Sequence, residues 1–178
     1  MIRRGMWHKT QVLVTGMALL FLPLFPLAVG RAQDTAGRAA DEAAIRQVVV
    51  NFSDGWNRHD ARAMCADLAE DGDFITWRGE QFHGRKSFED HHASLFAGLY
   101  NNTRRTDNVK RIWWLTPEIA SVDDYWTMTG ARTREGSDWP YREGYFNFLM
   151  MKRNGRWLVV LSHAADFNAS RPPTSPDR

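Results

Sequence analysis

A stripe of apolar side chains at helical spacing lies near the start of the recognisable domain. Its members share one helix face, at i, i+3, i+4, i+7 and i+11: Ile45, Val48, Val49, Phe52 and Trp56. Most of the positions between them are polar. This pattern predicts an amphipathic helix from about Asp41 to Trp56, packed through the stripe against the rest of the chain.

Two further helices are predicted after this one. Asp60 offers a carboxylate to the free backbone N–H groups that follow it, which predicts a second helix from Ala61 to about Glu70. Residues 71–73 form a turn signal, and residues 74–77 have the β-branched and aromatic composition of a strand. After a reversal over residues 78–84, a third helix is expected to begin near Ser87. Its predicted apolar face holds Phe88, His92, Leu95, Phe96 and Leu99.

The second half of the chain is typical of β-strands. Four strands are predicted, at residues 108–116, 119–129, 141–152 and 156–163. Asn154-Gly155 suits the two positive-φ positions of a type I′ hairpin turn between the last two strands. Helices followed by an antiparallel meander predict an α+β domain. Strands this long must twist and curl, so we expect a cone-shaped sheet with the N-terminal helices over its concave face.

The first 32 residues are typical of an export signal. Arg3, Arg4 and Lys9 precede an uncharged apolar run over residues 12–29, and the small residues Gly30 and Ala32 follow. We predict cleavage near residue 32, a domain over residues 41–168 and a disordered tail over residues 169–178. The mature protein is then expected to be periplasmic or secreted. The alternative is that the apolar run remains as an uncleaved membrane anchor, which Pro23 and Pro26 disfavour.

Loss of this segment changes the charge of the chain. The whole chain has 23 Lys and Arg against 21 Asp and Glu, a net charge of +2. Residues 1–32 hold four of the basic residues and none of the acidic ones, so the mature chain is left at −2. The basic character belongs to the precursor, and no nucleic-acid partner is predicted.

Several short motifs resemble those of a known superfamily. They are Trp56-Asn57-Arg58-His59-Asp60, Glu70-Asp71-Gly72-Asp73-Phe74, Gly84-Arg85, residues 92–98, Asn154-Gly155-Arg156-Trp157 and the strand-end His163. In order and spacing the chain resembles the nuclear transport factor 2-like superfamily, and within it the SnoaL-like branch of the SgcJ/EcaC type. The resemblance implies an α+β cone and a homodimer packed through the sheet. One departure is that His163-Ala164-Ala165 stands where many relatives have His-Asn-Thr.

Four residues are candidates for acid–base chemistry. His92 lies on the buried stripe of the third helix, where desolvation favours the neutral ring; it is alternatively a core histidine with both nitrogens hydrogen-bonded. His163 ends a central strand in phase with Trp157, Val159 and Leu161. Asp73 is a candidate base only by analogy with cone-fold isomerases and dehydratases, and otherwise caps its turn. Tyr125 is the preferred hydrogen-bond donor among the aromatic residues.

The chain is rich in aromatic residues that suit an apolar or aromatic ligand. The candidates for the ligand-binding wall are Trp56, Trp77, Phe96, Trp114, Trp126 and Phe146. The alternative is that many of them fill the core or the dimer interface.

Two functions follow from these residues. The first is a cofactor-free acid–base enzyme of the isomerase, dehydratase or cyclase type, in which His92 transfers protons. The second is a non-catalytic ligand-binding or dimerisation module of the same fold. No metal site is predicted, because His91 and His92 are adjacent and diverge on a helix. No cofactor is predicted either, since no Gly-x-Gly-x-x-Gly follows a strand.

Overall fold

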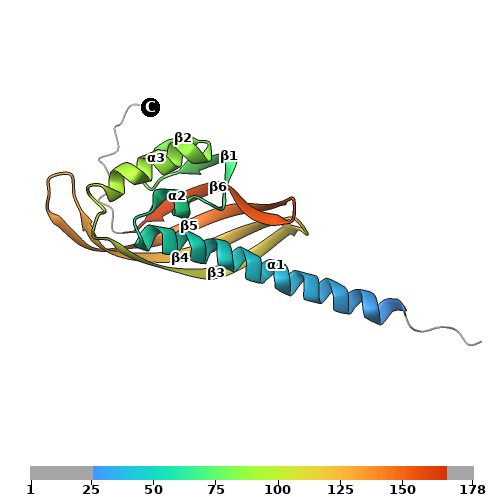
Figure 1. Cartoon of the computed structure of the whole chain (residues 1–178). Helices are drawn as coiled ribbons and strands as arrows, with labels where there is room; N and C mark the ends of the chain where they lie inside the picture. Colours follow the sequence, from blue (N-terminus) through green and yellow to red (C-terminus); the bar gives the residue numbers. More distant parts are fainter. Residues whose placement is uncertain (1–25, 168–178) are drawn as a thin grey trace, which may run out of the picture. The chain divides into compact units, whose positions relative to one another are not determined.

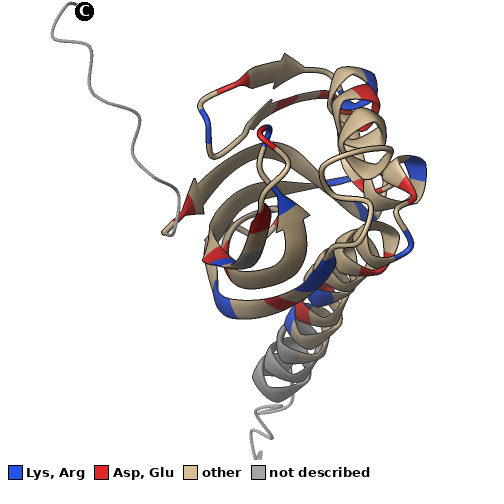
Figure 2. Cartoon of the chain, turned by 90° about the vertical axis from the view of Figure 1, so that its left-hand side faces the viewer, with Lys and Arg blue, Asp and Glu red and all other residues tan. Residues whose placement is uncertain are grey.

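A strongly curved six-stranded sheet is the framework of the domain (Figures 1 and 2). The computed structural model describes residues 26–167, and side chains from residue 36 onward with the exception of Pro140. The elements in chain order are α1 (Pro26–Asn57), α2 (Ala61–Met64), β1 (Leu68–Ile75), β2 (Gln81–His83), α3 (Arg85–Phe96), β3 (Arg104–Thr116), β4 (Ile119–Arg132), β5 (Asp138–Arg153) and β6 (Arg156–Asp166). The strand order is β2-β1-β6-β5-β4-β3, with β1 and β6 parallel and the other neighbours antiparallel. The predicted α+β architecture with a curved, mainly antiparallel sheet is confirmed.

The apolar stripe of α1 packs as its spacing predicts. All five of its members are buried: Ile45, Val48, Val49, Phe52 and Trp56. Phe52 meets the inner face of the sheet, where its ring lies edge-on to Phe146 and Phe148 of β5. Figure 2 shows α1 and α3 beside the curled strands. The apolar face of α1 therefore closes one side of the core.

The segment after α1 departs from the prediction. Asp60 does cap α2, accepting a hydrogen bond from the backbone N–H of Ala63 at 2.9 Å, but the helix ends at Met64 instead of continuing to Glu70. Leu68 already pairs with Val159 of β6 as the first residue of β1. A helical spacing of small and apolar residues was thus overridden by pairing with a strand distant in the sequence. Gly55 permits the close approach of α1 and α2, because a Cβ there would lie 2.2 Å from the backbone nitrogen of Met64.

Burial alternates along the long strands. In β4 the inward positions are Ala120, Val122, Asp124, Trp126 and Met128, all buried. The hairpin between β5 and β6 turns at Asn154 and Gly155, whose φ angles of 51° and 78° confirm the predicted turn. Alternation along strands of 11 to 16 residues gives this sheet a continuous inner face.

Gly144 of β5 lies where the neighbouring strands β4 and β6 both approach it closely. A Cβ at this position would lie 1.9 Å from the carbonyl oxygen of Ala165 on β6 and 2.8 Å from the indole ring of Trp126 on β4. Glycine therefore lets β4, β5 and β6 come together here, and a side chain would force them apart.

Two predicted segments fall outside what the structure describes. Residues 1–25 of the predicted export signal and the tail at 169–178 are not among the described residues, and of residues 26–32 only the helical backbone is described. Among the described residues, no helix combines the length and apolar character needed to cross a membrane.

Candidate functional site

A large cavity opens between α3, the turn joining β1 to β2, and the inner face of the sheet. Its volume is about 1350 Å³, enough for a drug-sized molecule. Residues 133–135 and Trp139, at the far end of the β4–β5 hairpin, also contribute to its wall. Seven aromatic residues contribute to the walls: Trp56, Trp77, Phe88, Tyr100, Trp126, Trp139 and Phe146. Several charged side chains lie among these rings.

His92 of α3 lies in the wall of this cavity and is 5% exposed. Its Nδ1 is 3.0 Å from the carbonyl oxygen of Phe88, one helical turn earlier. A carbonyl only accepts, so Nδ1 carries the proton and donates it, which leaves Nε2 with a lone pair. No hydrogen bond to Nε2 is found among the described residues. Burial lowers the pKa of His92 to about 3, against the opposing effect of the Phe88 hydrogen bond, and the nearby charge of Arg105 adds to the lowering.

Arg105 of β3 reaches the cavity above a pair of buried carboxylates. Its Nε lies 2.9 Å from both carboxylate oxygens of Asp107, two residues along the same strand. The second acid, Asp124 on β4, lies 3.8 Å from Nη2 of Arg105 and is fully buried. Four aromatic rings surround the guanidinium at 4.8–5.4 Å, those of Phe52, Trp56, Trp126 and Phe146.

The two carboxyl groups beside Arg105 differ in charge state. Burial raises the pKa of Asp124 to about 8, and the hydrogen bond and negative charge of Asp107 reinforce this. Burial would raise the pKa of Asp107 as well, but the charge and hydrogen bonds of Arg105 outweigh it and hold that pKa below its ordinary value. At neutral pH Asp107 is therefore the charged partner of Arg105, and Asp124 keeps its proton.

Arg142 of β5 is the second buried cation of the cavity. Its Nε donates to Asp166 of β6 at 2.6 Å, and its Nη1 donates to the hydroxyl oxygen of Tyr100 at 2.6 Å. The guanidinium carbon lies 4.6 Å from the ring centre of Trp77 and 4.1 Å from that of Trp139. Only 1% of Arg142 is exposed, so its charge depends on Asp166 and the aromatic faces.

The structure does not bring the other three candidate catalytic residues into the cavity wall. Asp73 points outward from β1, where its carboxylate lies 2.7 Å from Nδ1 of His83 in an exposed pair. Tyr125 lies on the outer face of β4, and its hydroxyl donates to Glu143, which raises the pKa of the phenol. His163 is exposed on the outer side of β6, across from Asn147.

A β-bulge explains the placement of His163. Leu149 of β5 pairs with Leu161, while the next residue, Met150, pairs with Val159, so β6 carries one extra residue at this point. The bulge reverses the alternation: Val159 is buried, whereas Ser162 is the buried residue beyond it. The prediction that Val159, Leu161 and His163 share one face of β6 is therefore wrong.

Four of the six predicted ligand-binding aromatic residues line the cavity, namely Trp56, Trp77, Trp126 and Phe146. Phe96 instead packs edge-on behind Trp56, with ring centres 5.2 Å apart. Trp114 lies against Trp157, with ring centres 5.5 Å apart, and under the guanidinium of Arg38. These two rings belong to the packing around the cavity and not to its wall.

Sequence reasoning missed the buried charges. They are Arg105, Asp107, Asp124, Arg142 and Asp166. Their signal was present in the strand alternation, because Asp124 stands in phase with Val122 and Trp126 on the apolar face of β4. An acid at an apolar position predicts a buried carboxyl that needs a partner.

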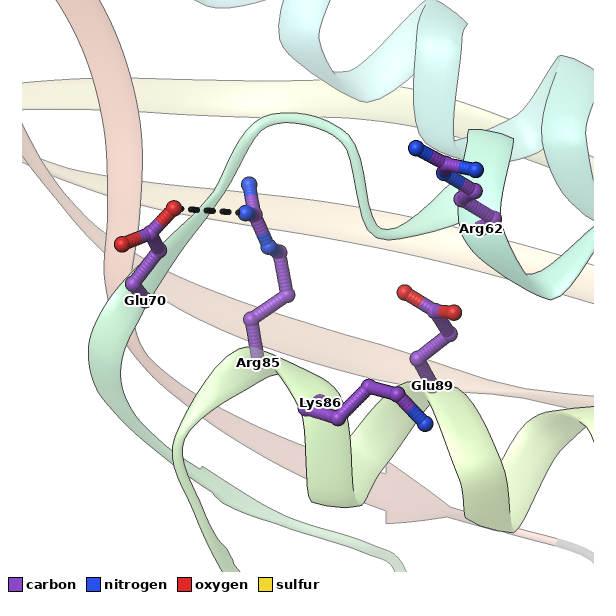
Figure 3. Close-up of a pocket in the computed structure, with 5 residues that line it drawn as sticks. All are labelled: Arg62, Glu70, Arg85, Lys86 and Glu89. Atoms are coloured by element: carbon purple, nitrogen blue, oxygen red, sulfur yellow. Dashed lines mark hydrogen bonds and ion pairs between the residues drawn. The ribbon is translucent and has the colours of Figure 1, made fainter.

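A second hollow, of about 530 Å³, lies beside α3 (Figure 3). Its lining consists of charged side chains, Arg62, Glu70, Arg85, Lys86 and Glu89. Arg85 reaches Glu70 at 2.9 Å, and Lys86 pairs with Asp90 of its own helix. Among the described residues no aromatic side chain lines this hollow, so the aromatic cavity is the better candidate for a ligand site. Among residues 26–167, no three side chains of His, Cys, Asp or Glu converge as metal ligands.

Comparison with known proteins identifies the fold. No family model matches the chain, and no curated protein does. A solved domain of unknown function with a cystatin-like fold, from Nostoc punctiforme, is 25% identical with a TM-score of 0.63, over 71% of this chain and 76% of that chain. An NTF-2 like protein of unknown function from Shewanella oneidensis is 19% identical with a TM-score of 0.60, over 71% and 99%. A protein from Novosphingobium aromaticivorans assigned as a scytalone dehydratase is 14% identical with a TM-score of 0.64, over 74% and 87%.

These likenesses define the class of protein. The chain has the nuclear transport factor 2-like, or cystatin-like, fold that its motifs predict. The narrower SgcJ/EcaC assignment stays a prediction. Since proteins of this fold differ in activity, function has to be argued from the cavity itself.

Proposed function

We propose that this protein binds a small apolar or aromatic molecule in the aromatic cavity and performs cofactor-free acid–base chemistry on it, of the isomerase, dehydratase or cyclase type. The observation that carries the proposal is the neutral His92 in the cavity wall, whose Nε2 has no hydrogen bond among the described residues. Aromatic walls supply the apolar contact, and a solved protein of similar fold is assigned as a dehydratase.

The chemistry open to this arrangement is proton transfer from carbon. Nε2 of His92 takes a proton from a carbon next to a carbonyl, and the electron pair of the C–H bond moves to the carbonyl oxygen as an enolate. Return of that proton to another carbon completes an isomerisation, and departure of a leaving group completes an elimination. Donors beside the cavity, the hydroxyl of Tyr100 and the guanidinium of Arg105, are placed among the lining residues to stabilise negative oxygen.

A binding protein without catalysis is the second candidate. The low pKa of His92 makes it a weak base in the empty cavity. Among the described residues, no carboxylate forms a hydrogen bond to its ring, so it lacks the orienting acid found in many catalytic pairs. Under this alternative the aromatic cavity holds a ligand, and His92 serves as a hydrogen-bond acceptor.

A deuterium-exchange experiment on a simple carbon acid distinguishes the two candidate functions. We expect the protein to accelerate deuterium exchange at the α-carbon of 2-tetralone in D₂O, followed by proton NMR. His92→Gln should reduce this exchange at least tenfold, because glutamine preserves polarity but provides no comparable base. His83→Gln, which alters an exposed imidazole outside the cavity, is the matched control and should exchange at the parent rate. Equal rates for the parent and His92→Gln would exclude His92 as the base.

We also propose that the protein is a homodimer packed through the outer face of the sheet. Large apolar side chains are exposed there on β3, on β5 and just after β6: Trp113, Leu115, Tyr141, Tyr145 and Phe167. Exposed aromatic residues on one sheet face favour association with a second copy. We expect light scattering at about 50 μM to give a dimer mass, and Tyr145→Arg to give a monomer. Val50→Arg, at an exposed position of α1, is the control that should remain dimeric; a monomeric parent chain would contradict the proposal.

A further inference from the structure

Three hydrogen-bond donors around the buried end of the cavity have no acceptor among the described residues. The indole N–H of Trp126 is buried and has no partner among the described residues. The Tyr100 hydroxyl oxygen accepts a hydrogen bond from Arg142, and no acceptor for its own proton is found in the part of the chain that the structure describes. Arg105 uses Nε and Nη2 on Asp107, and its Nη1 forms no hydrogen bond there.

These donors gather around one indole ring. The guanidinium carbon of Arg105 lies 5.1 Å from the ring centre of Trp126, and that of Arg142 lies 5.9 Å from the same centre. Tyr100 is joined to Arg142 at 2.6 Å. All four residues line the cavity. A buried donor without an acceptor is costly, so the site is incomplete until an acceptor arrives.

The buried end of the cavity favours an acceptor that is negative. Five arginines line the cavity, Arg78, Arg105, Arg132, Arg134 and Arg142. Five carboxyl groups lie among or beside them: Glu80, Glu135 and Asp166 in the lining, Asp107 behind Arg105 and Asp138 beside Arg132. The overall count is balanced, but the donors without an acceptor lie beside the buried guanidinium groups of Arg105 and Arg142. A hydrogen bond to an ionised acceptor is the stronger kind, so an anion is favoured at this end.

We infer that the cavity selects a ligand carrying a carboxylate on an aromatic or apolar body, and that this carboxylate is received by Tyr100, Arg105 and the indole N–H of Trp126. The inference rests on the proposed function, because it assumes that the ligand occupies this cavity. A carboxylate supplies several acceptor lone pairs to donors that lack them, and hydrogen bonds to an ionised group are the stronger kind. The rest of the ligand lies against the rings of Trp56 and Phe146, near Nε2 of His92.

The test compares two probes that differ in charge but hardly in shape. Naphthalene-2-carboxylate and naphthalene-2-carboxamide are titrated into the parent protein at pH 7 by calorimetry, with the Trp indole N–H signals followed by NMR. We expect the carboxylate to bind at least tenfold more tightly than the amide and to shift the Trp126 signal, which is identified by its loss in Trp126→Phe. Equal affinities, tighter binding of the amide, or binding of neither probe would overturn the inference.

Variants of the donors locate the carboxylate. Trp126→Phe and Tyr100→Phe keep a ring in place and remove one donor each, so each should reduce the carboxylate-to-amide ratio several-fold. Trp113→Phe removes an exposed indole on the outer face and should leave the ratio as in the parent. A ratio unaffected by both donor variants would contradict the assigned position even if the parent prefers the carboxylate.

The outcome is distinguishable from failure of the proposed function. If both probes bind equally and 2-tetralone still exchanges through His92, the carboxylate inference falls and the acid–base proposal stands. If the carboxylate is preferred but His92→Gln exchanges like the parent, the inference stands and catalysis by His92 falls.

Discussion

Replacing Asp166 by asparagine is expected to reduce the free energy of unfolding by about 3–5 kcal/mol. Asp166 holds the guanidinium of Arg142 at 2.6 Å, and this pair is shielded from water, with side-chain exposures of 1% and 0%. Asparagine keeps the shape of the residue and removes its charge, so the Arg142 cation stays buried without a charged partner. Urea unfolding of Asp166→Asn and the parent at pH 7 measures the difference.

An exposed pair provides the matched control. Arg132 and Asp138 also join β4 to β5, at 3.6 Å, but their side chains are 56% and 85% exposed. Water screens this pair, and Asp138→Asn should change the free energy of unfolding by less than about 1 kcal/mol. Similar losses in the two variants would show that burial of the Arg142 pair is not what makes it strong.

Stability is expected to fall as pH rises from about 6.5 to 8. The pKa of Asp124 is raised from an ordinary 3.8 to about 8 in the folded protein, so between these values the folded chain holds a proton that the unfolded chain has released. Raising the pH therefore favours unfolding, by up to roughly 1.4 kcal/mol per pH unit from this group.

His92 has the opposite effect at lower pH. Its pKa falls from 6.5 to about 3 on folding, so between these values the unfolded chain binds the extra proton and stability rises with pH. Burial lowers the pKa of His91 in the same direction. Between pH 4 and 6.5 the effects of His92 and Asp124 on stability oppose one another. The loss of stability caused by Asp124 is therefore visible only above pH 6.5.

The variant Asp124→Asn should abolish the loss of stability above pH 6.5. Asparagine resembles the protonated acid, can donate to Asp107 and does not titrate, so the stability of the variant relative to the parent should increase by about 1 kcal/mol or more between pH 6 and pH 8.5. Urea unfolding from pH 5 to 9 measures both curves. Asp123→Asn, the neighbouring acid on the outer face, is the control expected to retain the parent slope. Parallel curves for Asp124→Asn and the parent would mean that Asp124 is ionised in the folded protein.

The sequence predicts most of the fold because the relevant signals are local. The stripe of α1 and the Asn154-Gly155 turn depend on residues close together in the chain, and both are confirmed. The early strand β1 is different. It pairs in parallel with β6, some ninety residues later, and that pairing replaces the second half of the predicted helix after Asp60. Local propensity does not contain such a contact.

The candidate site, too, was predicted correctly where the signals are local and incorrectly where distant pairing decides. Helical phase places His92 in the buried wall, and strand phase places Trp126 and Phe146 beside it. The bulge in β6 moves His163 to the outer face, since a one-residue shift reverses every later side chain. Tyr125 lies on the partly polar face of β4, as its neighbours in the sequence indicate, but this face is the outer one.

Prediction of the buried charges requires both the local strand pattern and the pairing between strands. Strand alternation marks Asp124 as an acid among apolar neighbours, but its partner, Arg105, comes from the adjacent strand β3. Arg142 finds Asp166 across the β5–β6 pairing and Tyr100 in the loop after α3. These partners are set by the register of the sheet, which single-sequence patterns specify only loosely for strands of this length.

The most direct test of this account is the state of His92 itself. Long-range ¹H–¹⁵N NMR of the parent protein at pH 7, with His92→Gln to assign the ring, reports which nitrogen carries the proton. We predict a neutral ring protonated at Nδ1, with an Nε2 signal that shifts when 2-tetralone is added. A protonated Nε2, or an Nε2 signal that does not respond to 2-tetralone at saturating concentration, would contradict the assignment of this histidine to the ligand site.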